Sequence, residues 1–457
     1  MKINKVEITN FRGYKSKTEI DFNDFTVFIG KNDVGKSTIL QALDIFFNEK
    51  DAFVKLDDND FNVFNKNSDL KEIIIGIEFD DLPNEVIIDA TNKTTLKNEF
   101  LLTKENKLKI IKKSTDGKKF SVYIEAYHPK DSKCCDLLTK KNSDLKKILD
   151  DEKIDNANKS INADMRKAIW EHFKASDNRD TVLLDVSKKD GDLKQIWDNI
   201  SKYLPIYSLF QSDRKNDDND SEVQDPLKEA VKIIMSSNDI QNKLNEIAAE
   251  VKNKLQEVSD KTLSKLREMD QTIANNLHPS IPNTDSLKWS EVFKNVSIVD
   301  DMDIPINKRG SGVKRLILIN FFRAQVENKI SNDTNRSIIY AIEEPETSQH
   351  IENQKILIDS FISMLNANQN IQIIITTHSG FIVKQVDRKK LRVVSKYNND
   401  VNVENVKEGL LPFLSLNEIN YELFGEVSVE YFDELYGFIG LENRAIYNDY
   451  KNGNNMI

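Results

Sequence analysis

The stretch of this chain that most constrains its fold is Gly30-x-x-x-x-Gly35-Lys36-Ser37, which lies between an apolar segment and a helical one. The chain has 14 glycines in 457 residues, so two of them in one short loop are a specific signal. Residues 26–29 have the composition of a short buried strand, and residues 37–40 begin a helix. This spacing between strand and helix is that of a phosphate-binding P-loop, and the alternative is a chance glycine turn. We therefore predict an α/β fold built around a nucleotide site.

The chemistry of a P-loop assigns a role to each of its residues. Glycines let the backbone N–H groups converge on the β-phosphate, at the positive end of the helix dipole. Lys36 would reach the β- and γ-phosphates, and the Ser37 hydroxyl would help to hold Mg²⁺. ATP and Mg²⁺ are thus the predicted cofactors. The predicted nucleotide-binding residues of this loop are Gly30, Lys31, Asn32, Asp33, Val34, Gly35, Lys36, Ser37 and Thr38.

Two further apolar strands, far along the chain, end in side chains suited to phosphate chemistry. Residues 337–342 lead into Glu343 and Glu344, and residues 371–376 lead towards His378. An acid at such a strand end supplies a ligand for Mg²⁺, which we assign to Glu343. The neighbouring Glu344 can polarise the attacking water as a general base. His378 can contact the γ-phosphate, because ligands of α/β sheets gather at the carboxyl ends of strands; the alternative is a hydrogen-bonded core histidine.

A second glycine-rich loop, Gly310-Ser311-Gly312, precedes another apolar helix. Backbone N–H groups at the start of that helix could bind a second phosphate group. One chain with one P-loop has little use for such a loop within the same molecule. Two chains facing head to tail could each lend it to the ATP of the other, so we predict a homodimer with composite ATP sites, with further assembly of dimers left open.

The charge balance limits the partners. A net charge of −10 argues against a generally basic surface that coats nucleic acid, although a local basic groove stays compatible with it. One segment is locally basic, and its role is either a solvated strand face or a contact with the DNA backbone. Its lysines are Lys104, Lys107, Lys109, Lys112, Lys113, Lys118 and Lys119.

Apolar runs and cysteines indicate the compartment. No apolar run approaches the roughly 20 residues of a membrane helix, and the N-terminus lacks a secretory pattern, so we expect a cytoplasmic protein without a membrane contact. Cys134 and Cys135 are adjacent, which excludes a disulfide framework. Two buried or loop thiols are favoured over a redox or metal-binding pair.

Patterns along the chain predict a head that is split in sequence by insertions. Short alternating strands follow residue 71, including one at residues 86–88, and residues 140–200 have a polar helical pattern. The predicted parts are a head with the P-loop at 1–70, an inserted antiparallel β lobe with helices at 71–200, a head strand and acidic loop at 201–225, a helical arm at 226–285, the second part of the head at 286–410, and an aromatic, acidic tail at 411–457.

The arm and the tail each leave two interpretations open. In the arm, apolar residues step by four and three, as in a seam between helices, which fits either a short coiled coil or one long packed helix. These residues are Leu244, Ala248, Val251, Leu255 and Val258. The tail has a helical pattern with many aromatic and acidic residues, and it serves either as a docking surface or as a helix that completes the core.

The order of these motifs resembles the ABC-type ATPase heads of the SMC, RecF and OLD families, and most of all the OLD-like ATPases of bacterial antiphage systems. The resemblance covers residues 1–48 and roughly 203–385, and Asn10-Phe11-Arg12-Gly13-Tyr14 matches the opening that these families share. It implies a P-loop ABC-type ATPase head, discontinuous in sequence. By the same resemblance, Arg12 touches nucleotide phosphates or DNA.

The resemblance also assigns residues around the ATP site. It identifies Gly310 to Arg315 with the signature loop, His378 with the switch histidine, and Gln211 with the glutamine that senses Mg²⁺. Glu346 and His350 fall in the segment that resembles the D-loop, which crosses the dimer. Two departures stand out: Glu343 replaces the commoner Asp, and Val313-Lys314 replaces the usual Gly-Gln. They make a slow ATPase, used as a switch, the expected behaviour.

One domain of the OLD proteins has no counterpart in the motifs of this chain. Their Toprim nuclease needs a Glu-Gly pair after an apolar strand, followed by an Asp-x-Asp pair. Glu408-Gly409 has neither the strand before it nor the acid pair behind it. We therefore expect no nuclease activity from this chain alone, and the partner would be a separate toxin or nuclease effector. The alternative function is a RecF-like ATPase that binds DNA in repair or recombination.

Overall fold

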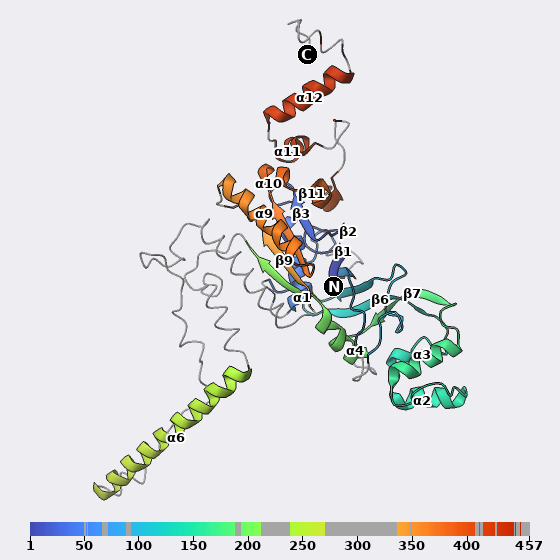
Figure 1. The fold of residues 1–457 in the computed structure, drawn as a ribbon, viewed down its shortest axis with the longest axis vertical. Coiled ribbons are helices and arrows are strands. Elements are labelled where there is room, and N and C mark those ends of the chain that lie inside the picture. The colour runs from blue at the N-terminus through green and yellow to red at the C-terminus, as the bar shows by residue number, and fades with distance from the viewer. Residues whose placement is uncertain are drawn as a thin grey trace. The chain divides into compact units, whose positions relative to one another are not determined.

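The computed structural model of the chain describes residues 1–49, 52, 54–65, 72–87, 93–187, 193–211, 238–269, 336–347, 350–406, 411, 415–425, 427–442, 444 and 448. The chain divides into two compact units, which are drawn in Figure 1. One comprises Met1–Asp213 with Val326–Ile457, and the other comprises Arg214–Gln325. The predicted loop Gly310-Ser311-Gly312 lies outside the described residues.

The first unit contains a six-stranded antiparallel sheet with the order β2-β1-β4-β5-β6-β7. Its strands are β1 (Lys2–Thr9), β2 (Thr18–Asp21), β4 (Ile73–Asp80), β5 (Leu108–Ser114), β6 (Ser121–Pro129) and β7 (Arg179–Asp185). Along β6, buried and partly buried residues alternate, as in an antiparallel sheet that has one face on the core. The two N-terminal strands thus belong to the same sheet as the strands after residue 71.

Two local predictions for this sheet are wrong. The stretch 140–200 is not helical throughout, because β7 pairs with β6 over seven residues. An edge strand is hydrogen-bonded to a single neighbour and buries few side chains. Its sequence therefore shows only a weak alternation of apolar and polar residues. At residues 86–88 the structure has only an isolated bridge between Val86 and Thr94, and Ile88 lies outside the described residues.

The second sheet of this unit has the order β12-β11-β3-β10-β9-β8. Its strands are β3 (Phe25–Ile29), β8 (Ile206–Phe210), β9 (Ile338–Glu343), β10 (Ile371–Thr377), β11 (Leu391–Tyr397) and β12 (Asp400–Asn405). All neighbours are parallel except β12 against β11. Every residue of β3 and β10 is buried, as expected for parallel strands covered on both faces. The predicted α/β class is confirmed.

Helices and short turns complete this unit. They are α1 (Lys36–Asn48), η2 (Leu137–Thr139), α2 (Asn142–Asp151), α3 (Asn162–His172), α4 (Leu193–Ile200), η3 (Ser201–Tyr203), α9 (Ile351–Ala367), α10 (Gly380–Gln385), η7 (Arg388–Lys390), α11 (Leu416–Phe424) and α12 (Val429–Glu442). The P-loop helix α1 lies in the core that the two sheets share. Its Phe47 stacks on Tyr207 of β8, with ring centroids 5.5 Å apart, and meets the edge of Phe79 of β4 at 6.1 Å.

The described part of the second unit is one continuous helix, α6 (Asn238–Met269), of 32 residues. Of the apolar side chains predicted to form its seam, Ala248 is buried, whereas Val251, Leu255 and Val258 are more than half exposed. A long helix thus lies within the predicted arm, and the arm itself stays a prediction. Its pairing with another helix stays a prediction. No helix of the described residues is long and apolar enough to cross a membrane.

The tail is helical, as predicted, and its first helix is held against the rest of the unit. The Asn420 side-chain amide of α11 donates to the Gly380 carbonyl oxygen of α10 over 2.9 Å. The buried Glu418 carboxylate accepts the backbone N–H of Leu411. Tyr431 of α12 is buried against Tyr421, whereas Phe432 is more than half exposed. The tail thus combines a packed helix with an exposed aromatic surface.

Candidate functional site

The predicted site residues meet at one edge of the parallel sheet. Strands β8, β9, β10 and β3 run parallel and side by side, so Gln211, the Glu343–Glu344 pair, His378 and the P-loop follow neighbouring strand ends. In the register, Thr376 pairs with Glu343 on one side of β10, and Thr377 pairs with Ile29 on the other. The histidine strand therefore separates the acidic strand from the phosphate loop.

Both P-loop glycines hold backbone conformations that other residues rarely adopt. Gly30 has φ of 153° and Gly35, the N-cap of α1, has φ of 107°. A Cβ atom on Gly30 would clash with the carbonyl oxygen of Val394 in β11. One on Gly35 would lie 3.3 Å from Val401 of β12. The β11–β12 hairpin thus packs directly against the P-loop. The sequence pattern did not predict this contact.

Tyr14 ties the phosphate loop to the segment after β1. Its hydroxyl donates a hydrogen bond to the carbonyl oxygen of Gly35 over 3.0 Å, and its ring is fully buried. Burial raises the pKa of this phenol well above its ordinary value, so the hydroxyl stays protonated and remains a donor. Sequence reasoning identified Tyr14 only as part of a shared opening motif and missed this role.

Lys36 lies curled within its own loop. Its Nζ donates to the carbonyl oxygens of Gly30 and Lys31, each over 2.8 Å, and the side chain is buried. Burial lowers the pKa of the ammonium group, and the carboxylates of Glu344 and Glu346 act in the opposite direction. Because loop carbonyl oxygens accept its hydrogen bonds, the Lys36 ammonium group can move to a phosphate with little rearrangement of the backbone.

Glu344 occupies a strained backbone position directly after β9. Its φ is 41°, in the left-handed region, and its N–H donates to the carbonyl oxygen of Thr376 over 3.0 Å. Non-glycine residues in this region cost about 1–3 kcal/mol and are often found at functional sites. The Glu344 Oε1 atom lies 3.4 Å from Nδ1 of His378, so the two side chains predicted to act on the γ-phosphate and water are neighbours.

Glu346, in the segment that resembles the D-loop, is buried within its own chain. The residue is 5% exposed, and a contact of this segment with a second chain stays a prediction. Its Oε1 atom accepts the Thr377 hydroxyl over 2.6 Å and the His378 N–H over 2.9 Å. Only the β9–β10 pairing brings these residues together. His350, from the same segment, is exposed at the start of α9.

The residues predicted to bind Mg²⁺ suit that ion. Ser37 opens α1, Glu343 ends β9 and Gln211 follows β8, so hydroxyl, carboxylate and amide oxygens end at one sheet edge. These are hard oxygen donors, and Mg²⁺ typically takes one or two protein ligands together with substrate phosphates. Within the described ranges no cluster of three His, Cys, Asp or Glu side chains forms a metal site, and such an ion needs none.

Arg12 is engaged with its own chain. Its Nε donates to the Asp60 carboxylate over 2.7 Å, and its Nη1 donates to the Gln41 side chain of α1. The arginine therefore touches the P-loop helix without facing solvent freely. Contact of Arg12 with phosphates or DNA stays a prediction.

Four of the seven lysines of the basic segment are ion-paired with acids of the same unit. Lys109 lies 3.0 Å from Glu125, and Lys112 lies 3.2 Å from Glu49. Lys112 is also buried over the ring of Phe46, and burial lowers its pKa. Lys107 pairs with Asp80, and Lys113 lies 3.7 Å from Glu72; Lys104, Lys118 and Lys119 are exposed. The segment is thus mainly part of the sheet's internal charge pairing.

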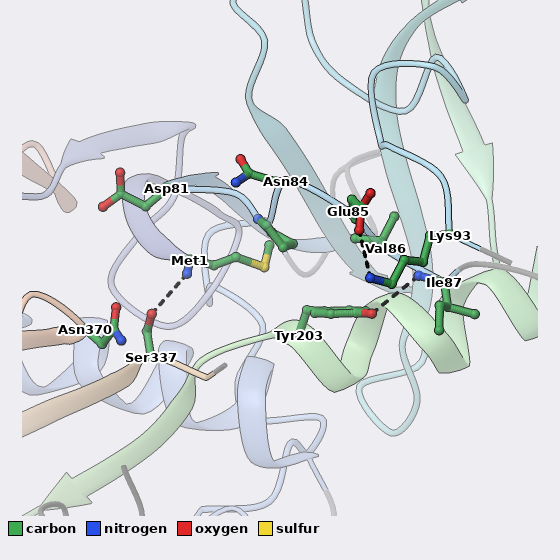
Figure 2. A pocket seen from close by; sticks show the side chains of 11 residues that line it. Met1, Asp81, Asn84, Glu85, Val86, Ile87, Lys93, Tyr203, Ser337 and Asn370 are labelled. Carbon is green, nitrogen blue, oxygen red and sulfur yellow. Dashed lines mark hydrogen bonds and ion pairs between the residues drawn. The ribbon is translucent and has the colours of Figure 1, made fainter. Parts of the chain in front are cut away.

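A pocket of about 410 Å³ lies at the opposite end of the parallel sheet (Figure 2). Tyr203, Ser337 and Asn370 line it, and each comes shortly before the amino end of a parallel strand. The Tyr203 hydroxyl accepts the N–H of Ile87, and Lys93 pairs with Glu85 at 2.9 Å. This pocket is therefore separate from the nucleotide edge.

Comparison with known proteins agrees with the geometry of this edge. Residues 1–383 match the family described as AAA ATPase domain. The chain belongs to this ATPase family. The ATPase is 26% identical over 469 residues to the endonuclease GajA of Bacillus cereus (strain HuB5-5), an alignment that covers 91% of the chain. The chain spans 60% of the length of that relative.

Two solved structures of SMC head domains are also similar to this chain. One is the SMC head domain from Thermotoga maritima, with 12% identity, a TM-score of 0.37, and coverage of 89% of this chain and 100% of that one. The other is an Smc head bound to the C-terminal winged-helix domain of ScpA, with 15% identity, a TM-score of 0.41, and coverage of 89% and 98%.

Proposed function

We propose that this chain binds ATP and hydrolyses it slowly, as an OLD-like ABC-type ATPase that acts in bacterial antiphage defence and controls a separate toxin or nuclease subunit. One observation carries the ATPase part. The P-loop lysine Lys36, the strand-end acid Glu344 and His378 share one edge of the sheet, with the Glu344 carboxylate 3.4 Å from the His378 ring.

In this proposal each side chain has its own task. Lys36 leaves the loop carbonyls and binds the β- and γ-phosphates, where its charge offsets that of the phosphate oxygens. Glu344 accepts a proton from the attacking water, and His378 contacts the γ-phosphate. Ser37 and Glu343 would hold Mg²⁺, which neutralises charge on the phosphates when bound. The strained backbone of Glu344 holds its carboxylate in a defined position, where it can orient the attacking water.

Two substitutions test this assignment, because they act at different steps. Lys36→Ala removes the cation at the phosphates and should abolish both ATP binding and turnover. Glu344→Gln keeps the shape of the side chain but removes the base, so ATP should bind and remain unhydrolysed. Nucleotide binding is measured by fluorescence anisotropy of a labelled ATP, and turnover by phosphate release. Wild-type turnover in Glu344→Gln would show that this residue is not the base.

The role as a sensor or scaffold rests on the tail and on the resemblance to OLD-like ATPases. Helices α11 and α12 contain no lysine, arginine or histidine. Tyr421 and Phe432 are exposed there, next to the exposed acids Glu422, Glu430 and Asp433. An aromatic surface with one sign of charge suits a basic protein partner better than DNA, since complementary charge guides association.

A further inference from the structure

Glu346 is a buried carboxylate with no metal-binding or nucleotide-binding role assigned to it above. Its side chain is 4% exposed, and burial of a carboxylate is costly unless hydrogen bonds compensate it. One oxygen, Oε1, accepts from both Thr377 and His378. The other, Oε2, is buried and accepts no hydrogen bond from the described residues. A residue needed only for packing would avoid this cost with a smaller or neutral side chain.

The same carboxylate faces the ring of the switch histidine. Glu346 Oε1 lies 3.4 Å from Nδ1 of His378, so this oxygen holds the backbone N–H and approaches the ring of one residue. The Glu344 Oε1 atom lies at the same distance of 3.4 Å from Nδ1. The two carboxylates differ in access, because the side chain of Glu344 is 24% exposed. Glu346 is therefore the fixed partner, and Glu344 is the one that solvent water can reach.

The loop around His378 is held by further contacts of the same kind. The Thr377 hydroxyl accepts the N–H of Ser379 over 3.0 Å, and the Ser379 hydroxyl donates to Gln354 of α9 over 2.9 Å. Ser379 also caps α10. These bonds fix the backbone on both sides of His378, so the orientation of its ring depends on the side chains that face Nδ1.

We propose that Glu346 is a positioning residue that holds His378 with its proton on Nδ1, which leaves Nε2 as the ring atom for the γ-phosphate and attacking water. A carboxylate can only accept, so a nitrogen that faces it carries the hydrogen. Carboxylate partners fix the tautomer and ring direction of histidines that bind metals in the same way. Glu344, the more exposed of the two carboxylates, then acts as the base. This inference rests on the proposed ATPase function.

The test combines kinetics with ring nitrogen spectroscopy. Glu346→Gln keeps an oxygen for the Thr377 hydroxyl and the His378 N–H but offers an amide that can donate to the ring. We expect kcat to fall about 10- to 100-fold, as for other partners of functional histidines, with the KM for ATP nearly unchanged. The matched control is Asp359→Asn, which changes an exposed acid of α9 and should leave both constants at wild-type values.

The spectroscopic readout needs no nucleotide. The chain has five histidines, so labelling their ring ¹⁵N atoms and comparing with His378→Gln assigns the His378 signals. The wild-type protein should show the Nδ1–H tautomer at His378, and Glu346→Gln should show an increased share of the Nε2–H tautomer. A purely structural role for Glu346 would not move this equilibrium in a folded variant.

The outcomes separate this inference from the proposed function. Turnover that is lost in Lys36→Ala but unchanged in Glu346→Gln, with an unchanged tautomer, overturns the role of Glu346 alone. Phosphate release that is equal in the wild-type protein and Lys36→Ala overturns the proposed ATPase function. Even then, the tautomer of His378 in Glu346→Gln supports or overturns the pairing of these two side chains.

Discussion

Burial and nearby charges have opposite effects on the pKa of Lys36. Lys36 is buried, which lowers its pKa, yet the acids near it favour the charged form. Its hydrogen bonds to Gly30 and Lys31 satisfy two of the three ammonium donors. Because these acceptors are loop carbonyls, a phosphate can replace them without leaving a buried charge unpaired. The ammonium group is thus paired within the loop in the absence of phosphate.

The buried thiol of Cys134 gives a prediction at the same scale. Burial is the largest cause that raises its pKa, to about 11, and the nearby Asp131 carboxylate adds to the effect. Only the thiolate reacts, so at pH 8 about one thiol in a thousand is reactive. In a Cys135→Ser variant, labelling by a disulfide reagent should be slow and rise about tenfold per pH unit up to about pH 11.

The comparison with Cys134→Ser makes this decisive. The remaining Cys135 is only partly buried and should react faster at every pH. Addition of urea should bring the Cys134 labelling rate to that of a free thiol. Labelling of Cys134 in the folded protein at the free-thiol rate would contradict its burial and reopen the redox or metal-binding interpretation.

At the scale of elements, α3 is joined to the antiparallel lobe by a buried ion pair. Arg166 Nε donates to the Glu99 carboxylate over 2.7 Å, and both side chains are almost completely buried. The other Glu99 oxygen accepts the Thr94 hydroxyl over 2.9 Å. Removal of one partner of a buried pair leaves the other charge uncompensated, which typically costs 3–5 kcal/mol.

Glu99→Gln should therefore lower the free energy of unfolding of this unit by about 3–5 kcal/mol, measured from its urea transition. The control on the same helix is Glu171→Gln, which breaks an exposed pair with Lys167 and should change stability by less than about 1 kcal/mol. Equal effects of the two substitutions would mean that the buried pair contributes no more than a surface pair.

At the scale of the whole molecule, the Gly-Ser-Gly loop should act on the ATP of a second chain. Ser311→Arg protein keeps its own P-loop, and Lys36→Ala protein keeps its own loop. In a heterodimer, one composite site carries both lesions and the other carries neither. Mixing the two inactive proteins should restore up to half the wild-type turnover per heterodimer, measured by phosphate release and divided by the share of heterodimers.

Subunit exchange is followed in parallel with two fluorescent labels. Exchange without recovered turnover would mean that the Gly-Ser-Gly loop acts on the ATP of its own chain or has no role in hydrolysis. A mixture of Ser311→Arg with Ser311→Arg carrying Lys36→Ala is the control, since it contains no intact composite site.

Removal of the tail tests the link to a separate effector. Truncation after residue 410 should spare ATP hydrolysis but release the effector, measured by pull-down of proteins from the native operon. The contact of Asn420 with Gly380 predicts some loss of stability in α10, which begins two residues after His378. A substitution pair on the exposed face, Tyr421→Ser with Phe432→Ser, keeps that contact and should also release the effector. Retention of the effector by both variants would move the docking surface elsewhere.

The sequence by itself determined the parts of this protein that depend on neighbours along the chain. The P-loop, the buried strands before Glu343 and His378, and the helical tail follow from glycine spacing and apolar periodicity, which are local properties. The AAA ATPase family and the α/β class agree with these predictions. The sequence did not predict the edge strand β7, because its structure depends on pairing with β6.

Only the tertiary structure decided which distant side chains share an environment. The β9–β10 register places Glu346 against His378, and the β11–β12 hairpin and Tyr14 close on the P-loop glycines. Lys109 and Lys112 pair with acids of the same chain, so these two lysines of the basic segment are not free to bind a partner. Contacts of this kind depend on strand order and register between segments that are separated along the chain, and a single sequence has no local pattern that encodes them.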